Sequence, residues 1–350
     1  MHEPDLLFDR IESGNFEWSD LEQVLKFSKK DVQRLYQISY EMKLRKFGRD
    51  LKIYIPNKRF PAISITGNQC HLNCSHCNKK YLDSMVAALT NEELESFLFK
   101  LSQEGGVGAL ISGGCEPDGS VPLLNFINTI KKIKDETDLI INAHTGLLNE
   151  VTAKGLADAK VDIISFDINA DEEIIREIYH LEKNVEDYKT AVELLKKYEL
   201  NIVPHICIGL HHGKIHKELD SLKFIKDLKI NPSLIVIIAL IPPKESEIVF
   251  EKPDSLDIGI LIAITRILFP DSEISLGCMR PRGNVKIDIE KHAIKAGITR
   301  IEIPSKKTLK WFSKLQPKSD LKFYSACCAI PIEFENKATS LPSDIKNYQI

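Results

Sequence analysis

Short runs rich in isoleucine and valine alternate with longer amphipathic stretches from Ala62 onward. This alternation is typical of repeated βα units around a parallel sheet, and eight such units make a complete barrel. Strands are expected near residues 62–66, 108–112, 139–143, 161–167, 202–208, 234–241, 273–277 and 299–303. Helices are expected near residues 91–104, 121–135, 149–158, 185–198, 216–228, 254–268, 287–296 and 305–314. The sequence therefore predicts an α/β fold with a complete (β/α)8 TIM-type barrel, and an open doubly wound sheet is the alternative.

The chain of 350 residues has room for one such barrel with extensions at both ends. Residues 1–58 have apolar side chains at helix-like spacing, which predicts a helical N-terminal extension. The barrel is expected over residues 59–315. Residues 316–350 leave the βα pattern and are expected to form an irregular C-terminal tail.

Charge and cysteine content limit the class of function. The formal net charge is −3, so no basic face for nucleic acid and no polybasic membrane anchor is expected. The beginning of the sequence, MHEPDLLFDR, lacks a signal-peptide pattern, and the apolar runs are too short to span a bilayer. We therefore expect a cytoplasmic protein. The 8 cysteines then favour metal or redox use over disulfides.

Three cysteines follow the first predicted strand at C-x3-C-x2-C spacing: Cys70, Cys74 and Cys77. Three thiolates on one loop can face one metal centre, yet they leave a four-coordinate site one ligand short. A [4Fe-4S] cluster held in this way keeps one iron open for a small molecule. The alternatives are a zinc knuckle, completed by His71 or His76, and three unrelated core thiols.

This loop, with the aromatic residue His76 just before the third cysteine, resembles the radical S-adenosylmethionine (SAM) superfamily. The resemblance implies that Cys70, Cys74 and Cys77 are the catalytic cysteines that hold a [4Fe-4S] cluster, and that SAM binds the open iron. It also implies an electron donor such as ferredoxin, and cleavage of SAM to methionine and a 5′-deoxyadenosyl radical that abstracts a hydrogen.

The second predicted strand ends in Ser112-Gly-Gly-Cys-Glu-Pro117. Two consecutive glycines, Gly113 and Gly114, allow a ligand to approach the backbone, and Glu116 can pair with an ammonium group. This segment resembles the GGE-type motif of the superfamily, which contacts the amino group of SAM.

The fourth predicted strand ends in Ser165-Phe-Asp-Ile-Asn169. Asp167 and Asn169 have the same parity on the strand, so both side chains can bond ribose hydroxyls from one face. Comparable positions bind the SAM ribose in biotin synthase-like enzymes. The alternative is a helix N-cap at Asn169 or Asp171.

The fifth predicted strand reads His205-Ile-Cys-Ile-Gly209 and resembles the GxIxG motif beside the adenine of SAM. It departs from that motif because Cys207 stands where isoleucine is usual and His205 where the first glycine is usual. We interpret Cys207 as an apolar wall residue against the adenine.

The seventh predicted strand ends in Ser275-Leu-Gly-Cys-Met-Arg-Pro-Arg-Gly283. In biotin synthase the comparable strand places an arginine as a ligand of a second, sulfur-donating cluster, and Cys278 occupies that place here. The alternative is that Arg280 and Arg282 bind a carboxylate of SAM or of the substrate, with Cys278 incidental.

Vicinal cysteines, Cys327 and Cys328, lie in the predicted tail, and such thiols capture metals and oxidise readily. If the tail folds back across the barrel mouth, these two and Cys278 can hold an auxiliary iron–sulfur cluster, with Ser325, Cys115 or an arginine as a fourth donor. The alternative is a pair of tail thiols with no cluster.

The layout resembles the biotin synthase and lipoyl synthase branch, and within it most closely the archaeal two-component lipoyl synthases. That resemblance implies sulfur insertion into an octanoyl chain on a lysine of a carrier protein, together with a second radical SAM subunit. The alternatives are a radical SAM methyltransferase or cofactor maturase without a second cluster, and a non-catalytic iron–sulfur partner protein.

Overall fold

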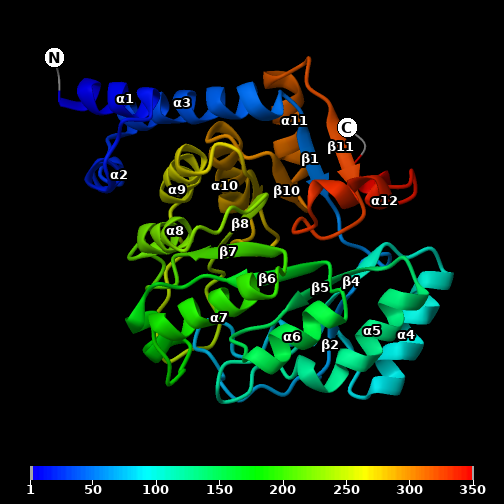
Figure 1. The fold of residues 1–350 in the computed structure, drawn as a ribbon. Helices are drawn as coiled ribbons and strands as arrows, with labels where there is room; N and C mark the ends of the chain where they lie inside the picture. Colours follow the sequence, from blue (N-terminus) through cyan, green and yellow to red (C-terminus); the bar gives the residue numbers. More distant parts are fainter. Residues whose placement is uncertain (1–2, 349–350) are drawn as a thin grey trace.

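One parallel sheet organises the molecule (Figure 1), which a computed structural model describes for residues 3–348. The sheet is 11-stranded, in the order β11-β1-β10-β9-β8-β7-β6-β5-β4-β2-β3. The strands are β1 (Leu51–Tyr54), β2 (Ala62–Ser64), β3 (Val86–Ala87), β4 (Gly108–Ser112), β5 (Ile140–His144), β6 (Ile163–Asp167), β7 (Ile202–Ile208), β8 (Leu234–Ala239), β9 (Glu273–Leu276), β10 (Arg300–Glu302) and β11 (Leu321–Tyr324).

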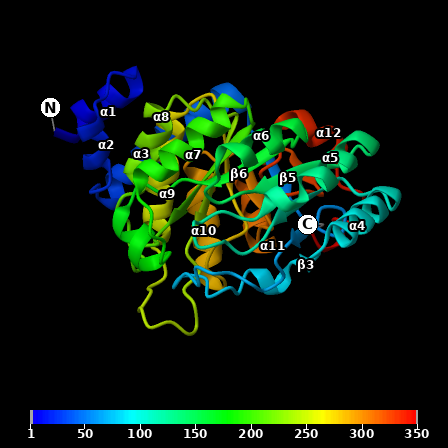
Figure 2. The ribbon, with the colours of Figure 1, turned by 60° about the horizontal axis from the view of Figure 1, so that its bottom comes forward.

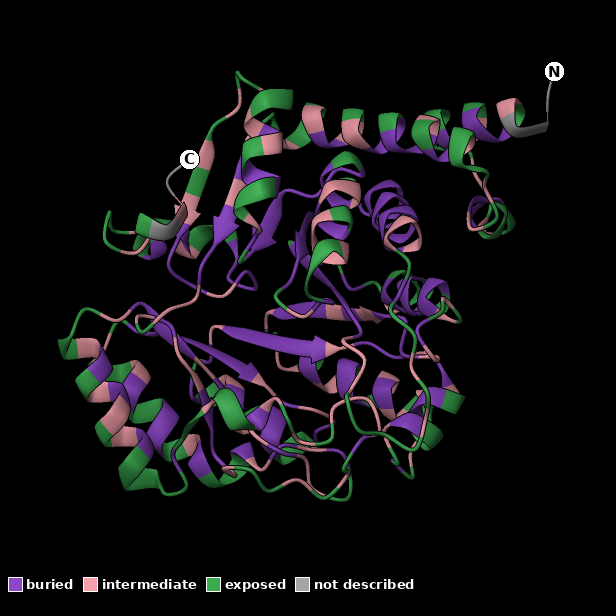
Figure 3. Ribbon diagram, turned by 180° about the vertical axis from the view of Figure 1, so that it is seen from behind, coloured by how far each residue is buried: buried purple, intermediate pink, exposed green. Residues whose placement is uncertain are grey.

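Each of the predicted strands is present, as β2 and β4 to β10, and they lie side by side in chain order. Their near-continuous apolar sequences suit strands that are covered on both faces. β8 is buried at every position, and Figure 3 shows the strands as the most buried layer. The carboxyl ends of these strands therefore form one edge, where the predicted site residues lie.

Closure into a complete barrel is not confirmed. β10 pairs with β1, and β2 pairs with β3, so both positions that closure would use are occupied by additional strands. Within residues 3–348, no pairing joins the two edge strands β11 and β3. The sheet is therefore an open half-barrel.

Helices cover the outer face of the sheet. The predicted helices are present as α4 (Asn91–Gln103), α5 (Ile127–Glu136), α6 (Glu150–Asp158), α7 (Val185–Lys197), α8 (Glu218–Asp227), α9 (Ser255–Leu268), α10 (Asn284–Lys295) and α11 (Lys306–Leu315). The helix predicted over residues 121–135 begins with a separate short turn, η2 (Leu123–Phe126), before α5. The helix η3 (Ile174–Ile178) follows β6 and is a single π-type turn. A further short turn, η1 (Leu82–Ser84), precedes β3.

The N-terminal segment is helical only as far as Phe47, in α1 (Glu3–Ser13), α2 (Trp18–Val24) and α3 (Lys29–Phe47). α3 packs against α9 and α10, and α1 packs against α3 (Figure 1). The prediction that residues 1–58 are a helical extension is therefore wrong for residues 51–54, because β1 joins the sheet between β10 and β11.

The C-terminal tail is more ordered than predicted. β11 pairs with β1, and η4 (Ile332–Phe334), α12 (Glu335–Ala338) and η5 (Lys346–Tyr348) follow it. A buried ionic network fixes the tail: the Arg300 guanidinium contacts Glu335 at 3.0 Å and also pairs with Glu273, and Lys52 Nζ lies 2.8 Å from both carboxylates. The boundaries at residues 58 and 315 stay predictions.

Two further features concern the loop after β8 and the lengths of the helices. The loop between β8 and α9 projects from the body (Figure 2, yellow-green). Among residues 3–348, no helix combines the length and the apolar character needed to cross a bilayer.

Candidate active site

The cysteine loop starts where β2 ends and is held by the loop that follows β4. The backbone N–H of Gly114 donates to Oγ1 of Thr66 at 2.7 Å, and the N–H of His71 donates to the carbonyl of Cys115 at 2.8 Å. A Cβ atom on Gly114 would lie 1.9 Å from the carbonyl oxygen of Gln69. Glycine is therefore required at position 114 because the cysteine loop packs directly against its backbone.

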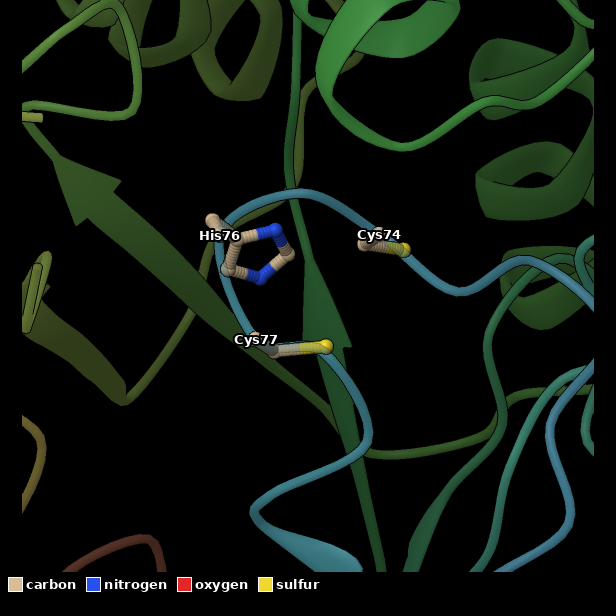
Figure 4. A group of neighbouring side chains, drawn as sticks. All are labelled: Cys74, His76 and Cys77. Atoms are coloured by element: carbon tan, nitrogen blue, oxygen red, sulfur yellow. The ribbon is translucent and has the colours of Figure 1, made fainter. Parts of the chain in front are cut away.

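Two of the three predicted cluster cysteines converge. The ligand atoms of Cys74, His76 and Cys77 lie within 4.8 Å of one another (Figure 4). Cys70 lies outside this group, and its Sγ accepts a hydrogen bond from the backbone N–H of Cys115 at 3.3 Å. The Cys74 thiol in turn lies 3.4 Å from the carbonyl of Tyr179.

The local hydrogen bonds favour thiolates at two of these positions. The Cys115 thiol donates to Cys70 and, with backbone N–H groups, lowers the pKa of Cys70 to about 5. The neighbouring Cys74 side chain lowers the pKa of Cys77. Because the thiolate is the metal-binding form of cysteine, this environment suits a metal centre with sulfur ligands.

His76 is an internal residue of the loop. Its ring lies 5.2 Å from the ring of Tyr179, and burial lowers its pKa to about 4. Its Nδ1 atom is buried and has no hydrogen-bond partner among the described residues. The trio that contains His76 also suits the zinc alternative, so geometry alone does not separate zinc from an iron–sulfur cluster.

Glu116 lies beside the cysteine loop, as the sequence predicts. Its Oε2 atom is 3.4 Å from Nδ1 of His71, and both side chains are well exposed. Its own N–H donates to the carbonyl of Ser120 at 2.8 Å, which fixes the turn. The carboxylate thus lies at the cysteine loop, and its contact with the amino group of SAM stays a prediction.

A histidine partner of Asp167 was missed by the sequence analysis. His144, the last residue of β5, places Nε2 3.1 Å from Oδ2 of Asp167, the last residue of β6. His205 of β7 is the register partner of Asp167, and its ring lies 6.0 Å from the ring of His144. The shared position of His144 and Asp167 at neighbouring strand ends was the signal available in the sequence.

Burial and mutual charge interactions shift the pKa values of Asp167, His144 and His205. Burial works against an ionised Asp167, but His144 and His205 overcome it and hold the pKa of Asp167 to about 2. Burial lowers the pKa of His144, and Asp167 reverses that effect so that the pKa is raised. Burial lowers the pKa of His205 to about 4. The arrangement is therefore an ion pair beside a neutral imidazole.

The sequence suggested two roles for the residues after β6: binding of the SAM ribose, or capping of the helical turn that follows. Oδ1 of Asn169 accepts from the N–H of Asp171 at 2.9 Å, and its Nδ2 atom has no partner among the described residues. Oδ1 of Asp171 accepts from the N–H of Glu173 at 3.0 Å, so Asp171 caps the helical turn that follows. The N-cap alternative thus holds for Asp171, and a role of Asn169 in ribose binding stays a prediction.

Cys207 and Gly209 lie at the exit of β7. Cys207 packs against the apolar clusters inside the sheet, and burial raises the pKa of its thiol. Its place against the adenine of SAM stays a prediction. The N–H of Gly209 donates to Oε1 of the buried Glu218 at 2.8 Å.

A second cysteine group forms where the tail meets β10. Oε2 of Glu302 accepts from the N–H of Cys328 at 3.1 Å and lies 3.9 Å from Sγ of Cys327. The ligand atoms of Glu302, Cys327 and Cys328 lie within 4.8 Å of one another. Burial raises the pKa of Glu302, while the thiols of Cys328 and Cys278, which donate toward the carboxylate, oppose the rise.

The tail therefore folds back so that Cys278, Cys327 and Cys328 all face Glu302, a donor that the sequence analysis missed. The fourth donors proposed from the sequence have other partners. Ser325 Oγ lies 2.7 Å from Oδ2 of Asp344, and the Cys115 thiol donates to Cys70.

Arg280 has other partners as well. It is 2 % exposed, and its NH2 group donates to Oε1 of Glu290 at 2.7 Å and to the carbonyl of Glu302 at 2.7 Å. Arg280 would have to break these hydrogen bonds in order to contact SAM. In the structure, it connects the segment after β9 to α10. The predicted SAM contact of Arg280 stays a prediction.

Tyr81 connects the two cysteine groups. Burial raises the pKa of its hydroxyl, and the thiols of Cys207, Cys77 and Cys278 act in the same direction. Cys77 of the cysteine loop and Cys278 therefore both lie within electrostatic range of one hydroxyl.

Comparison with known proteins identifies the family. Residues 64–247, more than half of the chain, match the family model of the radical SAM superfamily. The chain is 24% identical to biotin synthase of Leptospira biflexa over 268 residues, which are 74% of this chain and 73% of that enzyme. It is 24% identical to biotin synthase of Bacillus cytotoxicus over 169 residues, 47% of this chain and 49% of the enzyme. The match thus spans about half of the length of the Bacillus enzyme.

Solved structures agree at the level of the fold. The chain superposes on an FeFe-hydrogenase maturase from Carboxydothermus hydrogenoformans with a TM-score of 0.69 and 17% identity, covering 95% of this chain and 81% of that one. Methylornithine synthase gives a TM-score of 0.63 and 19% identity, with 85% of each chain covered. The matched family segment contains the cysteine loop, Glu116, Asp167 and Gly209, which favours an iron–sulfur cluster over zinc. This chain belongs to the radical SAM superfamily, whose enzymes use a [4Fe-4S] cluster and SAM, and its curated relatives lie in the biotin synthase and lipoyl synthase-like branch.

Proposed function

We propose that this radical SAM enzyme inserts sulfur into an octanoyl chain carried on a lysine of a carrier protein, as one component of a two-component lipoyl synthase of the archaeal type. The observation that carries the proposal is the second cysteine group, in which Cys327 and Cys328 converge on Glu302 and the thiol of Cys278 lies near the same carboxylate. A cluster that donates sulfur needs a second set of thiolate ligands of this kind.

The cysteine loop suits the first cluster and SAM. The surroundings of Cys70 and Cys77 favour their thiolates, and the sulfur of Cys74 lies within 4.8 Å of that of Cys77. The glycine backbone at Gly114 leaves room where any side chain would collide with the loop. When bound, the cluster and SAM supply a strongly oxidising carbon radical that removes hydrogen from an unactivated carbon. The chain's own contribution is to orient SAM, through Glu116, Asp167 and Asn169, and to keep water out.

The second group suits an auxiliary iron–sulfur cluster that serves as the sulfur donor. Cysteine thiolates are the ordinary ligands of iron–sulfur clusters, and Glu302 supplies an oxygen donor at the same point. Arg300, through Glu335 of α12, holds the tail that carries Cys327 and Cys328 in place. The group is therefore rigidly mounted, although it comes from three separate parts of the chain.

The reaction replaces one C–H bond by one C–S bond for each sulfur inserted. Each replacement consumes one SAM and one electron from a donor such as ferredoxin, and releases methionine and 5′-deoxyadenosine, which carries away the hydrogen. Cys278, Cys327 and Cys328 would hold the auxiliary cluster, which would supply the sulfur and take up the electron released when the C–S bond forms. A second radical SAM subunit is the expected partner for the other sulfur.

An opening next to the cysteine loop offers a route for the octanoyl-lysyl arm. A cavity of about 500 Å³ lies between Cys74 and the loop that follows β8, where Ile248 contributes apolar surface. The Ser246 hydroxyl, which lies 3.4 Å from the carbonyl of Ser75, joins the two loops. We expect the carrier protein to dock here.

The test is anaerobic reconstitution with iron and sulfide, followed by incubation with SAM, a reductant and an octanoyl-lysyl peptide, with and without a candidate partner subunit. The expected result is 5′-deoxyadenosine together with peptide that carries added sulfur, detected by mass. Iron and sulfide should approach about eight of each per chain, against about four for an enzyme with one cluster. Cleavage of SAM with about four irons and no thiolated peptide under any condition would overturn the proposal in favour of a methyltransferase or maturase.

A further inference from the structure

Two imidazoles and a carboxylate converge on the loops after β6 and β7, separate from both cysteine groups. The ligand atoms of Glu173, His211 and His216 lie within 4.8 Å of one another. Nε2 of His211 is 3.0 Å from Oε1 of Glu173. The rings of His211 and His216 are nearly parallel, with centroids 4.1 Å apart and an interplanar angle of 20°.

Asp171 supports one of these imidazoles from behind. Nδ1 of His216 lies 2.6 Å from Oδ2 of Asp171, whose side chain is only 5% exposed. A proton on Nδ1 that is donated to this carboxylate leaves the lone pair of Nε2 free. A buried carboxylate behind a histidine is the usual outer support of a metal-binding imidazole, because it fixes the tautomer and the ring orientation.

The backbone holds His211 and His216 in position. The buried Glu218 accepts from the N–H of Gly209 at 2.8 Å and from the N–H of His216 at 2.7 Å, so one carboxylate ties both ends of the loop. A Cβ on Gly213 would lie 2.3 Å from the carbonyl of Glu251, and its φ is +89°. The turn between the two histidines therefore needs glycine and has little freedom.

An independent observation points to a small ligand. His211, His216 and Asn169 line a cavity of about 20 Å³. This volume holds about one particle the size of a water molecule.

We propose that Glu173, His211 and His216 bind one divalent transition-metal ion of the zinc type, with Asp171 as the outer support of His216. Two imidazoles and one carboxylate are the ligand set of many three-residue zinc sites. Such a site lacks sulfur ligands, so it is chemically distinct from both cysteine groups.

The ion would join the two loops that flank the predicted SAM pocket. Asp171 and Glu173 follow Asn169, and His211 follows Gly209. This consequence rests on the proposed function: fixing the two loops should favour SAM binding without touching the reacting atoms. Loss of the ion should therefore raise the KM for SAM and leave kcat nearly unchanged.

The test uses the full-length, cluster-reconstituted protein, treated with EDTA, incubated with one equivalent of Zn²⁺ and desalted. We expect about one zinc per chain, with X-ray absorption showing nitrogen and oxygen ligands at roughly 2.0–2.1 Å and no sulfur shell at about 2.3 Å. His211→Ala and Glu173→Ala should retain less than about a tenth of the zinc. The matched control is His212→Ala, because His212 is adjacent in the chain but lies outside the converging group.

Two results would overturn the site: wild-type protein that holds no zinc after desalting, or zinc that persists in the His211→Ala/His216→Ala double variant. Iron content and circular dichroism of each variant show whether the fold is intact, and the conservative variant Glu173→Asp gives a second measure if His211→Ala misfolds. If the protein binds zinc through nitrogen and oxygen but never thiolates the peptide, the proposed function is wrong and the zinc site is still supported.

Discussion

The Nε2 atom of His144 lies 3.1 Å from the Oδ2 atom of Asp167, so the last residues of two neighbouring strands form an ion pair at the mouth of the sheet. Asp167 is the residue predicted to bond the ribose of SAM. The pair keeps this carboxylate ionised and oriented, which makes His144 a positioning residue for the SAM site.

Replacing His144 by glutamine should reduce stability by about 1 kcal/mol, because half-exposed pairs are screened by solvent and Asp167 is 46% exposed. The lowered pKa of Asp167 contributes stability above its unfolded pKa of about 4, which is lost as pH falls toward 2. The pKa of His144 is higher in the folded than in the unfolded protein, so it contributes stability at low pH. This contribution is lost as the pH rises through the pKa of His144 in the folded protein. Anaerobic urea unfolding should therefore show the largest difference between wild type and variant near pH 5, and a smaller one near pH 9. An equal difference at both pH values would contradict the ion pair.

Substitution of Cys70, Cys74 or Cys77 by alanine should abolish SAM cleavage, because the first cluster loses a thiolate ligand. Iron content should fall by about four per chain. The measurements are iron analysis and chromatography of 5′-deoxyadenosine, with Lys131→Ala on the exposed side of α5 as the control. Normal cleavage by Cys70→Ala would mean that the pairing of Cys70 with Cys115 is its only role.

Cys327→Ala and Cys278→Ala should retain SAM cleavage and lose sulfur transfer, because both thiols lie near Glu302 and neither belongs to the group of Cys74, His76 and Cys77. Glu302→Gln keeps an acceptor for the N–H of Cys328 but loses the charge, so it should lower retained iron without unfolding the tail. Iron and sulfide analysis and peptide mass measure these effects. Unchanged thiolation in the cysteine variants would remove the auxiliary cluster from the reaction.

Gly114→Ala should disturb the cysteine loop while the sheet stays folded, since the new Cβ would overlap the carbonyl of Gln69. We expect loss of most iron from the first site after reconstitution, with an unchanged far-ultraviolet circular dichroism spectrum. Gly113→Ala gives a graded comparison, because its nearest neighbour is the Thr66 side chain at 3.0 Å. Equal iron retention by the two variants would argue against the close packing at position 114.

Arg300→Met should destabilise the protein by about 3 kcal/mol or more, because it leaves Glu273 and Glu335 buried with one cation fewer. The matched control is Lys322→Ala, whose pair with Asp50 is half exposed and should contribute less than about 1 kcal/mol. Urea unfolding provides the comparison. Similar losses in both variants would show that the buried network does not anchor the tail.

The strands and helices of the βα units could be predicted because their apolar runs are long and distinct. The open form of the sheet could not be predicted from the sequence. β1 is only four residues long, and its pairing with β10 joins segments at opposite ends of the sequence. Glu302 and Cys328 are 26 residues apart in sequence and meet only because β11 docks on β1. Likewise, the burial of Arg280 against Glu290 depends on how α10 packs, which no local pattern around Arg280 encodes.

The position of β11 at the edge of the sheet sets an order of assembly. Translation completes the cysteine loop and most of the sheet long before β11 is made, and the tail thiols reach Glu302 only after this last strand has docked. A nascent or proteolytically shortened chain without β11 would therefore hold the cysteine loop but not the docked tail thiols. Under the proposed function, such a molecule would cleave SAM without transferring sulfur.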